Sequence, residues 1–446
     1  MPFQDDLDRA NDDDLGLGDF QHYVPAGTKD GAKEPVAPVT PQKPPKQQQN
    51  HDKILPNASL EQVVTLKSPL VVISKLCNPF VNLAIEDYVY NAMGIPQNGS
   101  ENYNRLMFYT NSPCVVIGKN QNPWKEANIP LLTSLRIPLV RRRSGGGTVV
   151  HDHGNVNFSF MTTKERFDRF KFAELVKHSV NNSGRAKYEL EVNSRGDITT
   201  VQQPDGINYK TSGSAYKLSK GKSYHHGTML LRLNLKILGK LLSRDVGKLG
   251  VVDAMNSIDS VKSKVVNIEM EQDDFINCVT ESFEKEYGEP GNGIVSEPEQ
   301  TDEFDQNELF GLTDFVEANS SEPVTVFTID ESTELPEGVT KVSNELQEWS
   351  WRFGATPKFT HELTNAQYGF RVKFHVGKDG FIEKFDLDFD GQVQNVRSKE
   401  LIIESFDFLQ LYIKDNQLPY IGSNIAGFVT DDVLSDWVGN CIDGTN

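Results

Sequence analysis

The 446-residue sequence contains few cysteines and no long apolar run. Its four cysteines lie at least 37 residues apart without a CxxC or Cys/His pair, so we expect neither a zinc ribbon nor a disulfide scaffold. No stretch approaches the ~18 consecutive apolar residues of a membrane-spanning helix, so we predict no membrane span. The glycine spacings of a Walker loop and of a dinucleotide-binding fingerprint are also missing.

Acidic residues outnumber basic ones chiefly in two segments, which together carry −19 against a net charge of −18 for the whole chain. Residues 1–56 carry −4, and residues 286–340, which contain no Lys or Arg, carry −15. The rest of the chain is therefore near neutral, and it has no basic stripe of the kind that binds nucleic acid. We predict no nucleic-acid partner.

Composition and periodicity divide the chain into four parts of an α+β protein. Residues 1–56 are rich in Asp, Pro and Gln and predict a disordered tail. Residues 57–285 form a compact domain, and the acidic, proline-interrupted residues 286–340 a linker or insert. Residues 341–446 form a smaller α+β unit, in which apolar residues alternate before and after a Gly-Lys-Asp-Gly turn, as in a β-hairpin.

Local signals predict individual helices and strands. Asn78 and Pro79 are typical of a helix start, and Gly94 of its end. Trp349 and Trp351 alternate at strand spacing, and with Trp124 they are typical of core or domain-interface aromatics rather than of a cofactor site. Apolar runs predict strands at 70–73, 106–109, 114–117 and 138–140, helices at 165–181, 400–413 and 430–438, and a strand running into a helix at 229–241.

The run "RRRSGGGTVVHDHGNVN" at 141–157 has the composition of an anion-binding loop. Three glycines let the backbone approach a ligand closely and turn its N–H groups toward it. Three arginines supply permanent charge and forked donors that suit phosphate. The alternative is a tight turn beside a solvated basic face.

A second candidate is Lys210, which precedes the small-residue run Thr211–Ala215. Small neighbours let a strand lie flat against a ligand while the ammonium points inward, where it binds an anion or acts as a base or nucleophile. The alternative is an exposed lysine on a Ser/Gly loop. The histidine pairs at 151/153 and 225/226 could be metal ligands, but no thiolate or HExxH motif accompanies them, so we predict no dedicated metal site.

These motifs, together with "NPFVNLAIEDYV", "VVIGKNQNPWKEAN", "HHGTMLL" and "DSVKSKVVN", occur in the order and approximate spacing of the lipoate–protein ligase A family. The chain resembles this family over residues 69–285 and 341–440. The resemblance implies a biotin/lipoyl ligase-like catalytic domain of mixed sheets packed with helices. It also implies a smaller α+β C-terminal accessory domain that begins near "WSWRFGATPKF".

The resemblance further implies a two-step reaction, in which lipoate and ATP form lipoyl-AMP and the lipoyl group then passes to a lysine of a lipoyl domain. The implied catalytic residue is Lys210. Mg²⁺ would accompany ATP, with Asp197 as its candidate contact. Strand residues 115–117 and 158–160 would supply an apolar slot for the lipoyl chain. The implied ATP-binding residues are Arg142, Gly147, Thr148, Val149, Val150, Asp197 and Lys210, and the implied lipoate-binding residues are Gly145, Gly146, His151, Lys210, Ser212, Gly213, Ser214 and Ala215.

Two departures from the family pattern keep alternatives open. Gly196 replaces an asparagine that is usual before Asp197, and Lys217 stands where arginine is common. The alternatives are a lipoyl- or octanoyltransferase that uses a CoA thioester or premade lipoyl-AMP, and a non-catalytic protein that binds lipoyl domains.

The implied partners are the lipoyl domains of 2-oxoacid dehydrogenase E2 subunits and the glycine cleavage H protein, and we expect a monomer. The resemblance implies a mitochondrial location. The cytoplasm is the alternative, because the N-terminal residues are not Arg-rich and acid-poor as in a presequence.

Overall fold

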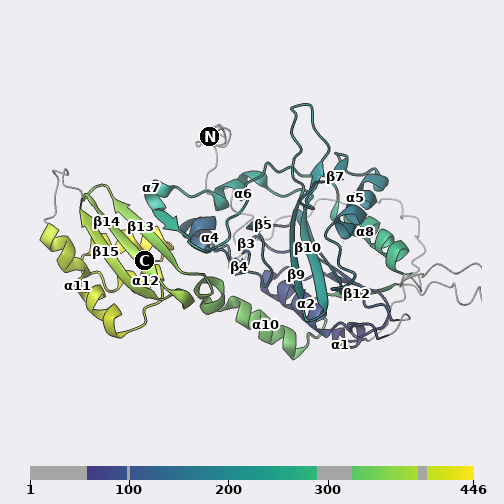
Figure 1. The fold of residues 1–446 in the computed structure, drawn as a ribbon, viewed down its shortest axis with the longest axis horizontal. Coiled ribbons are helices and arrows are strands. Elements are labelled where there is room, and N and C mark those ends of the chain that lie inside the picture. The colour runs from purple at the N-terminus through teal and green to yellow at the C-terminus, as the bar shows by residue number, and fades with distance from the viewer. Residues whose placement is uncertain (1–57, 98–100, 289–323, 390–398, 446) are drawn as a thin grey trace, which may run out of the picture.

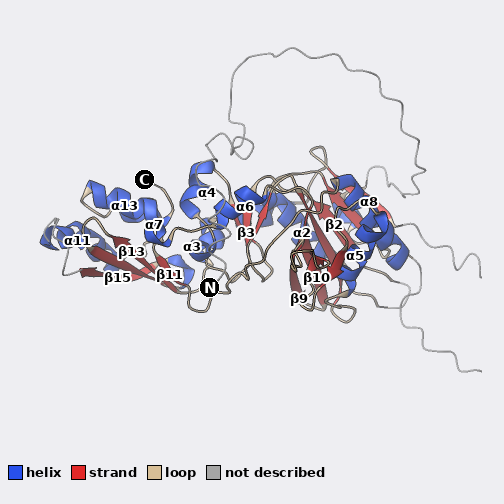
Figure 2. Cartoon of the chain, turned by 90° about the horizontal axis from the view of Figure 1, so that it is seen from above, coloured by secondary structure: helices blue, strands red, loops and turns tan. Residues whose placement is uncertain are grey.

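The computed structural model describes residues 58–97, 101–288, 324–389 and 399–445. In this part the chain forms a large lobe with a six-stranded mixed sheet and a small lobe with a four-stranded antiparallel sheet (Figure 1). A three-stranded sheet lies between them (Figure 2). The predicted α+β class is confirmed. None of the described helices has the length and apolar composition that a membrane crossing requires.

The large-lobe sheet has the order β12-β1-β2-β6-β10-β9. β1 is parallel to both of its neighbours, and the other pairs are antiparallel. β9 and β10 form a hairpin through Lys220 and Gly221, whose φ angles of 53° and 72° suit a two-residue turn. The strand bounds are β1 Leu70–Ser74, β2 Arg105–Tyr109, β6 Asn155–Thr163, β9 Ser212–Ser219, β10 Lys222–Leu230 and β12 Thr325–Ile329.

Helices cover both faces of this sheet, because successive strand residues point to opposite sides. Val72 and Met107 pack in the core beneath α2 and α10, whereas Val71 and Phe108 pack in the core beneath α5 and α8. The short β7–β8 hairpin and α1 complete the lobe. The bounds are α1 Leu60–Val63, α2 Pro79–Ala92, α5 Lys171–Ser183, β7 Leu190–Val192, β8 Ile198–Thr200, α8 Gln272–Tyr287 and α10 Glu337–Gln347.

Two helix starts show where local sequence patterns predict a helix boundary correctly and where they do not. The prediction at Asn78 is confirmed, because its side chain accepts hydrogen bonds from two N–H groups in the first turn of α2. The helix predicted at 165–181 begins later, at Lys171. Asp168 Oδ1 accepts from the N–H groups of Phe170 and Lys171, and this contact fixes the start.

The three-stranded sheet has the order β4-β3-β5, with β3 parallel to β4 and antiparallel to β5. Its core is continuous with that of the small lobe, since Val115 and Leu139 belong to the same cluster as Phe374 and Leu434. This cluster joins the two lobes. The bounds are β3 Cys114–Ile117, α3 Pro123–Glu126, α4 Ile129–Leu135, β4 Leu139–Arg141, β5 Val149–His151 and α6 Leu235–Leu242.

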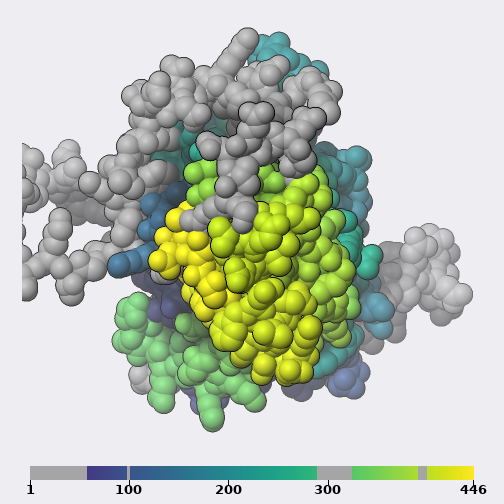
Figure 3. Space-filling model, turned by 90° about the vertical axis from the view of Figure 1, so that its left-hand side faces the viewer, coloured from purple at the N-terminus to yellow at the C-terminus, as the bar shows by residue number. Residues whose placement is uncertain are grey.

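The small lobe contains the sheet β11-β13-β14-β15 and its helices. The predicted hairpin is confirmed: β14 pairs with β15 across the turn, where Asp379 and Gly380 both have positive φ angles. Figure 3 looks onto this lobe, whose yellow surface belongs to the C-terminal residues. The bounds are α7 Val246–Leu249, β11 Val251–Asp253, β13 Phe359–Asn365, β14 Phe370–Val376, β15 Ile382–Phe389, α11 Lys399–Asp415, α12 Gly422–Ala426 and α13 Asp432–Ile442.

Some strands and helices belong to a different lobe from the one that the predicted sequence boundaries give them. The prediction of a linker at 286–340 is wrong for residues 325–329, which form β12 beside β1. α10 also begins inside that segment and packs on α2. Conversely, β11 lies within 57–285 but pairs with β13 of the small lobe. The pairings join segments far apart in sequence, which local patterns do not reveal. The predicted tail 1–56 and residues 289–323 lie outside the described part of the chain.

The turn Ser350–Gly354 closes the free edge of β4. The strand predicted from the spacing of Trp349 and Trp351 is wrong, because these residues lie in or next to a π-helical turn. Side chains bridge the two segments: Trp351 Nε1 donates to the Arg141 carbonyl, and Arg352 Nε donates to the Leu139 carbonyl. Backbone pairing is thus replaced by side-chain hydrogen bonds, and the predicted interface position of Trp351 is confirmed.

The side chain of Arg141 also stabilises this junction between β4 and the turn Ser350–Gly354. Its guanidinium is fully buried and donates to the carbonyls of Lys119, Gln121, Trp351 and Arg352 and to the hydroxyl of Thr356. Burial lowers its pKa to about 9, so it remains charged at neutral pH. With the Gly118 carbonyl at 3.4 Å, this buried arginine has six oxygen partners and links β3, β4 and the entrance to the small lobe.

We predict that Arg141→Met lowers the free energy of unfolding by at least about 3 kcal/mol, because several buried acceptors lose their donor. Arg166→Met, at an exposed position, should change it by less than about 0.5 kcal/mol. Urea unfolding followed by circular dichroism measures both. Equal stability of the two variants would contradict the assignment.

Candidate active site

The loop Arg143–Thr148 connects β4 to β5 and lies against β9. A Cβ atom at Gly146, where φ is 92°, would lie 2.9 Å from Arg142 Nη2 and 3.3 Å from Ala215 Cβ. A Cβ at Gly213 would lie 3.1 Å from Val149 Cγ1. Only residues without bulky side chains allow this approach, and the structure thus brings the two motifs predicted from the sequence into contact.

Arg142 holds the loop in place rather than facing outward. Its guanidinium is 5% exposed and donates to the carbonyls of Gly145 and Gly147 at 2.7 Å, and to Ser144 Oγ at 3.1 Å. Burial lowers its pKa to about 10, so the charge persists at neutral pH. The resemblance implies a direct contact of Arg142 with the nucleotide, which stays a prediction; in this structure the guanidinium holds the loop carbonyls.

The glycine amides remain available for a ligand. Among the hydrogen bonds of the described residues, none uses the N–H of Gly145, Gly146 or Gly147 as a donor, whereas Thr148 N donates to Ser260 Oγ at 2.8 Å. A Cβ added to Gly145 would meet nothing within 4 Å, so there is open space in front of it. A loop whose carbonyls are bound by an arginine, and whose amides donate no hydrogen bond, has the features of an anion-binding loop.

Lys210 lies just before β9 and forms an ion pair with Asp197, at 2.9 Å between Nζ and Oδ1. Its backbone is held by Lys264 and Val266, so its position is fixed between two segments. Asp197 is 8% exposed and follows Gly196, whose φ of 81° lies in the left-handed region. The departure from asparagine at Gly196 is thus compatible with the turn.

The small-residue run divides between packing and the site. Ser212 Oγ accepts a hydrogen bond from Ile198 N and is buried, so this side chain fixes β9 to β8. Ser214 Oγ is buried without a hydrogen-bond partner. Gly213 and Ala215 therefore form the surface of β9 that faces the glycine loop and β5, whereas the side chain of Ser214, between them on the strand, points to the other face.

His151 belongs to a buried polar chain. Its Nδ1 lies 3.0 Å from Asn111 Nδ2, and its Nε2 lies 3.1 Å from Thr228 Oγ1, which in turn donates to Asn157 Oδ1. Burial lowers the pKa of His151 to about 3, so the ring is neutral and both nitrogens are engaged. A direct contact with lipoate stays a prediction for this residue.

His225 and His226 lie on opposite faces of β10, as neighbouring strand residues must. His225 packs between Tyr216 and Phe158, and its ring nitrogens have no hydrogen-bond partner. The pair therefore cannot chelate one metal ion. No cluster of three or more His, Cys, Asp or Glu suited to a metal was found in the described ranges.

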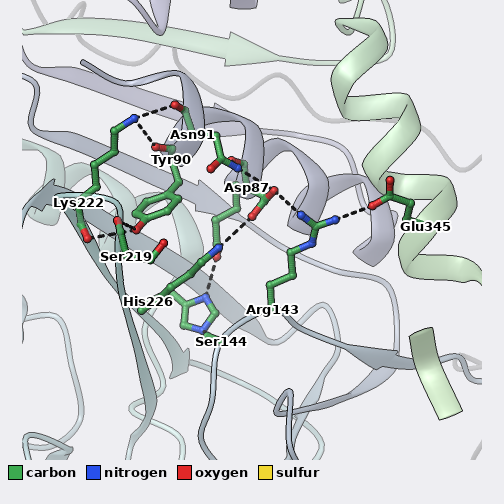
Figure 4. A network of polar contacts seen from close by, with 11 residues as sticks. Asp87, Tyr90, Asn91, Arg143, Ser144, Ser219, Lys222, His226 and Glu345 are labelled. Carbon is green, nitrogen blue, oxygen red and sulfur yellow. Dashed lines mark hydrogen bonds and ion pairs between the residues drawn. The ribbon is translucent and has the colours of Figure 1, made fainter. Parts of the chain in front are cut away.

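Sequence reasoning did not assign His226, Glu86 or Ser144 to the site. His226 Nε2 lies 2.8 Å from Ser144 Oγ, and its Nδ1 lies 2.8 Å from Glu86 Oε1 (Figure 4). Glu86 comes from α2, far from the loop in sequence. The adjacency of Ser144 to the glycines was the one signal available, because its partners depend on how α2 and β10 pack.

Charged residues surround this group at the end nearest α10. Asp87 accepts from Arg143 Nη1 at 3.0 Å and from Lys217 Nζ at 3.2 Å, and Arg143 also pairs with Glu345 of α10 at 2.8 Å (Figure 4). Lys217 Nζ lies 4.8 Å from the centre of the Tyr90 ring. A narrow cavity adjoins these residues, lined by Leu83, Glu86, Asp87, Arg142, Arg143, Tyr224 and Leu346.

The apolar slot predicted at 115–117 and 158–160 is a packed core instead. Val115 and Ile117 are buried in the cluster shared with the small lobe. Phe158 and Phe160 stack against or adjoin Phe172 of α5. These residues are apolar because they are interior, which the composition alone could not distinguish from a ligand-lining role.

Comparisons with known proteins give a consistent result. A model of the lipoyl protein ligase A/B catalytic domain matches residues 78–284. A Saccharomyces cerevisiae protein named "Putative lipoate-protein ligase A" is 33% identical over 349 residues, which are 77% of this chain and 75% of that protein. The human protein "Lipoyl amidotransferase LIPT1, mitochondrial" is 32% identical over 297 residues, 66% of this chain and 68% of that protein. The solved structure of Plasmodium falciparum LipL1 in complex with lipoate aligns at 23% identity and a TM-score of 0.48, covering 85% of this chain and 100% of that chain.

Acidification should destabilise the fold through buried neutral histidines. Burial lowers the pKa of His151, His225 and His361 to about 3, against 6.5 for an exposed ring. Below pH 6.5 the unfolded chain binds protons that the folded chain does not. Stability is therefore complete above pH 6.5 and falls toward pH 3, by about 1.4 kcal/mol per pH unit for each histidine.

His225→Phe should reduce that slope by one histidine's share, since it removes two buried nitrogens that lack partners. The measurement is urea unfolding between pH 7 and pH 5. Parallel curves for the variant and the parent protein would contradict a neutral, buried His225.

Gly146→Ala should lower the free energy of unfolding by about 1–2 kcal/mol, because its φ angle is left-handed and the new Cβ crowds Arg142. Gly145→Ala is the matched control, since its Cβ enters open space, and it should change stability by less than about 0.5 kcal/mol. Thermal unfolding of both variants tests the loop geometry, and equal losses would refute it.

Proposed function

This chain belongs to the lipoyl protein ligase A/B family, and from that premise we propose that it activates lipoate with ATP and transfers the lipoyl group to a lysine of a lipoyl domain. The observation that carries the proposal is the Lys210–Asp197 ion pair at the foot of β9, in a fold that sets β9 against a loop with three unused glycine amides. This arrangement supplies one side-chain cation and several backbone donors.

The chemistry requires such a combination. A lipoate carboxylate and the α-phosphate of ATP repel each other, so positive charge must lie between them before they can react. Preorganised donors commonly supply the largest share of catalysis in such reactions, because they need no reorganisation as charge develops. In the protein without substrates, Asp197 holds the Lys210 ammonium in an ion pair, close to the two anionic groups that it would neutralise.

In the first step a carboxylate oxygen attacks the α-phosphorus, lipoyl-AMP forms and pyrophosphate leaves. In the second step the acyl group passes from lipoyl-AMP to the ε-amine of the acceptor lysine, so that an amide forms and AMP is released. Lys210 contacts the acyl oxygen and the α-phosphate in both steps. It therefore neutralises the same two anionic groups in the formation of lipoyl-AMP and in the transfer of the lipoyl group to the acceptor lysine.

For the remaining residues we propose the roles that the family resemblance implies. The backbone of Gly147–Val150 and Asp197 contact the nucleotide, and Gly145 and Gly146 contact the acyl group together with Gly213 and Ala215. Arg142 holds the loop carbonyls away from both. Asp197 would supply the one protein carboxylate for a Mg²⁺ ion that accompanies ATP; phosphates and water would supply the other ligands, and the ion would neutralise phosphate charge.

A lipoyl transferase is the second candidate function. The similarity to the human amidotransferase, 32% identity, is close to that to the yeast ligase, 33% identity. A transferase would take the acyl group from a CoA thioester, from premade lipoyl-AMP or from another lipoylated protein. We propose lipoyl domains of 2-oxoacid dehydrogenase complexes and the glycine cleavage H protein as acceptors, and a mitochondrial location, as in the name of the human relative.

The deciding experiment incubates the purified protein and a lipoyl domain with lipoate and ATP, and separately with octanoyl-CoA. The ligase proposal predicts pyrophosphate release and lipoylation in the first mixture. Acyl transfer from octanoyl-CoA without pyrophosphate release from lipoate and ATP would replace it by the transferase.

Lys210→Ala should lower the rate of lipoylation by about 100- to 1000-fold, the usual effect of removing one preorganised donor. The exposed Lys236→Ala should retain the parent rate. Thermal unfolding of both variants confirms that they are folded. Full activity of Lys210→Ala would refute the role of this ammonium.

A further inference from the structure

Three side chains from distant parts of the chain form a hydrogen-bonded line at the base of the glycine loop. Ser144 Oγ lies 2.8 Å from His226 Nε2, and His226 Nδ1 lies 2.8 Å from Glu86 Oε1. All three are buried, at 2%, 8% and 3% exposure. These are the distances and the order of a nucleophile, its base and the group that orients the base.

The partners of each atom fix the direction of the hydrogen bonds. Glu86 accepts at both oxygens, from the His226 ring through Oε1 and from the Tyr109 hydroxyl through Oε2 at 3.0 Å. With Nδ1–H turned to the carboxylate, His226 Nε2 is the acceptor, and the Ser144 hydroxyl donates to it. Arg142 Nε donates to the same oxygen at 3.1 Å, and this charge favours a developing alkoxide.

Donors for an oxyanion lie directly after the serine. The amides of Gly145, Gly146 and Gly147 donate no hydrogen bond in the described part of the chain, and the space in front of Gly145 is open. A tetrahedral intermediate on Ser144 would need such donors, because negative charge develops on the acyl oxygen. A serine that only tied down the loop would need neither a base nor free amides.

We propose that Ser144 accepts the acyl group transiently and forms an acyl-serine ester. The proposal deepens the transfer step and rests on the acyl-transfer function proposed above. It assigns His226 as the general base and Glu86 as the positioning residue that orients its ring. The donor is an activated acyl compound, namely an acyl thioester or an acyl adenylate.

The step balances without a further reactant. Ser144 Oγ attacks the acyl carbon and its proton passes to His226 Nε2; the C–S or C–O bond to the donor breaks, and His226 returns the proton to the departing thiolate or phosphate. The acceptor lysine amine then attacks the ester carbon. An amide forms, the ester C–O bond breaks, and a proton from the amine reaches Ser144 Oγ through His226.

The burial of Ser144 has a function in this scheme. An ester at a 2% exposed position is shielded from water, which would otherwise hydrolyse it before the acceptor arrives. Gly146, two residues further on, is exposed, so the donor approaches from the side of the loop.

The test incubates the full-length protein with octanoyl-CoA, and separately with octanoyl-AMP, without an acceptor, followed by acid quenching and intact-protein mass spectrometry. We expect an octanoyl adduct that maps to Ser144 and disappears when a lipoyl domain is added. Ser144→Ala should abolish the adduct. Ser144→Cys should retain it as a hydroxylamine-sensitive thioester, which also shows that a residue-144 variant folds.

Variants of the other two residues separate catalysis from packing. His226→Gln should slow adduct formation by about 100-fold or more, the usual contribution of a general base. Glu86→Gln should slow it too, whereas Glu86→Asp, which keeps the carboxylate, should restore part of the rate. Ser223→Ala, on the same strand as His226, should match the parent protein.

The outcomes are distinguishable. Acyl transfer to a lipoyl domain with no adduct in the parent protein or in Ser144→Cys would overturn the acyl-serine and leave the proposed function intact. An adduct that maps to another residue would also overturn it. Absence of both transfer and adduct with every donor would overturn the proposed function together with the inference.

Discussion

The guanidinium of Arg142 binds the carbonyls of Gly145 and Gly147 at 2.7 Å, and the rest of the site depends on this contact. A peptide group presents its carbonyl and its N–H to opposite sides, so a loop whose carbonyls are drawn inward has its amides free for a ligand. The same guanidinium donates to Ser144 Oγ. One buried charge thus shapes the anion-binding loop and polarises the hydroxyl beside it.

The three consecutive arginines have three different tasks, although their side chains are chemically identical. Arg141 is enclosed by carbonyls of the junction with the small lobe, Arg142 holds the loop, and Arg143 links Asp87 of α2 to Glu345 of α10. Because they are consecutive, the contacts of the two lobes and of the loop are joined by a few backbone bonds. Their charge alone suggested phosphate binding, and their positions indicate that two of them organise the backbone.

The sequence predicted those features that depend on neighbouring residues. The start of α2 and the β14–β15 hairpin are of this kind. The contact of the glycine loop with the run after Lys210 joins distant segments, and only the family resemblance pointed to it. It did not predict β12, β11 or the turn at Trp351, whose partners lie far away in the chain. Nor did it predict the Glu86–His226–Ser144 line, because only the packing of α2 on β10 brings these groups together.

The central claim is that the Lys210 ammonium leaves Asp197 to join two anionic groups at the glycine loop. A crystal structure with a non-hydrolysable lipoyl-adenylate analogue tests it most directly. The account predicts that Lys210 Nζ forms hydrogen bonds with both the acyl oxygen and the phosphate, and that glycine amides of the loop also donate to the ligand. It is contradicted if Lys210 stays bound only to Asp197 while the analogue occupies a site away from the loop.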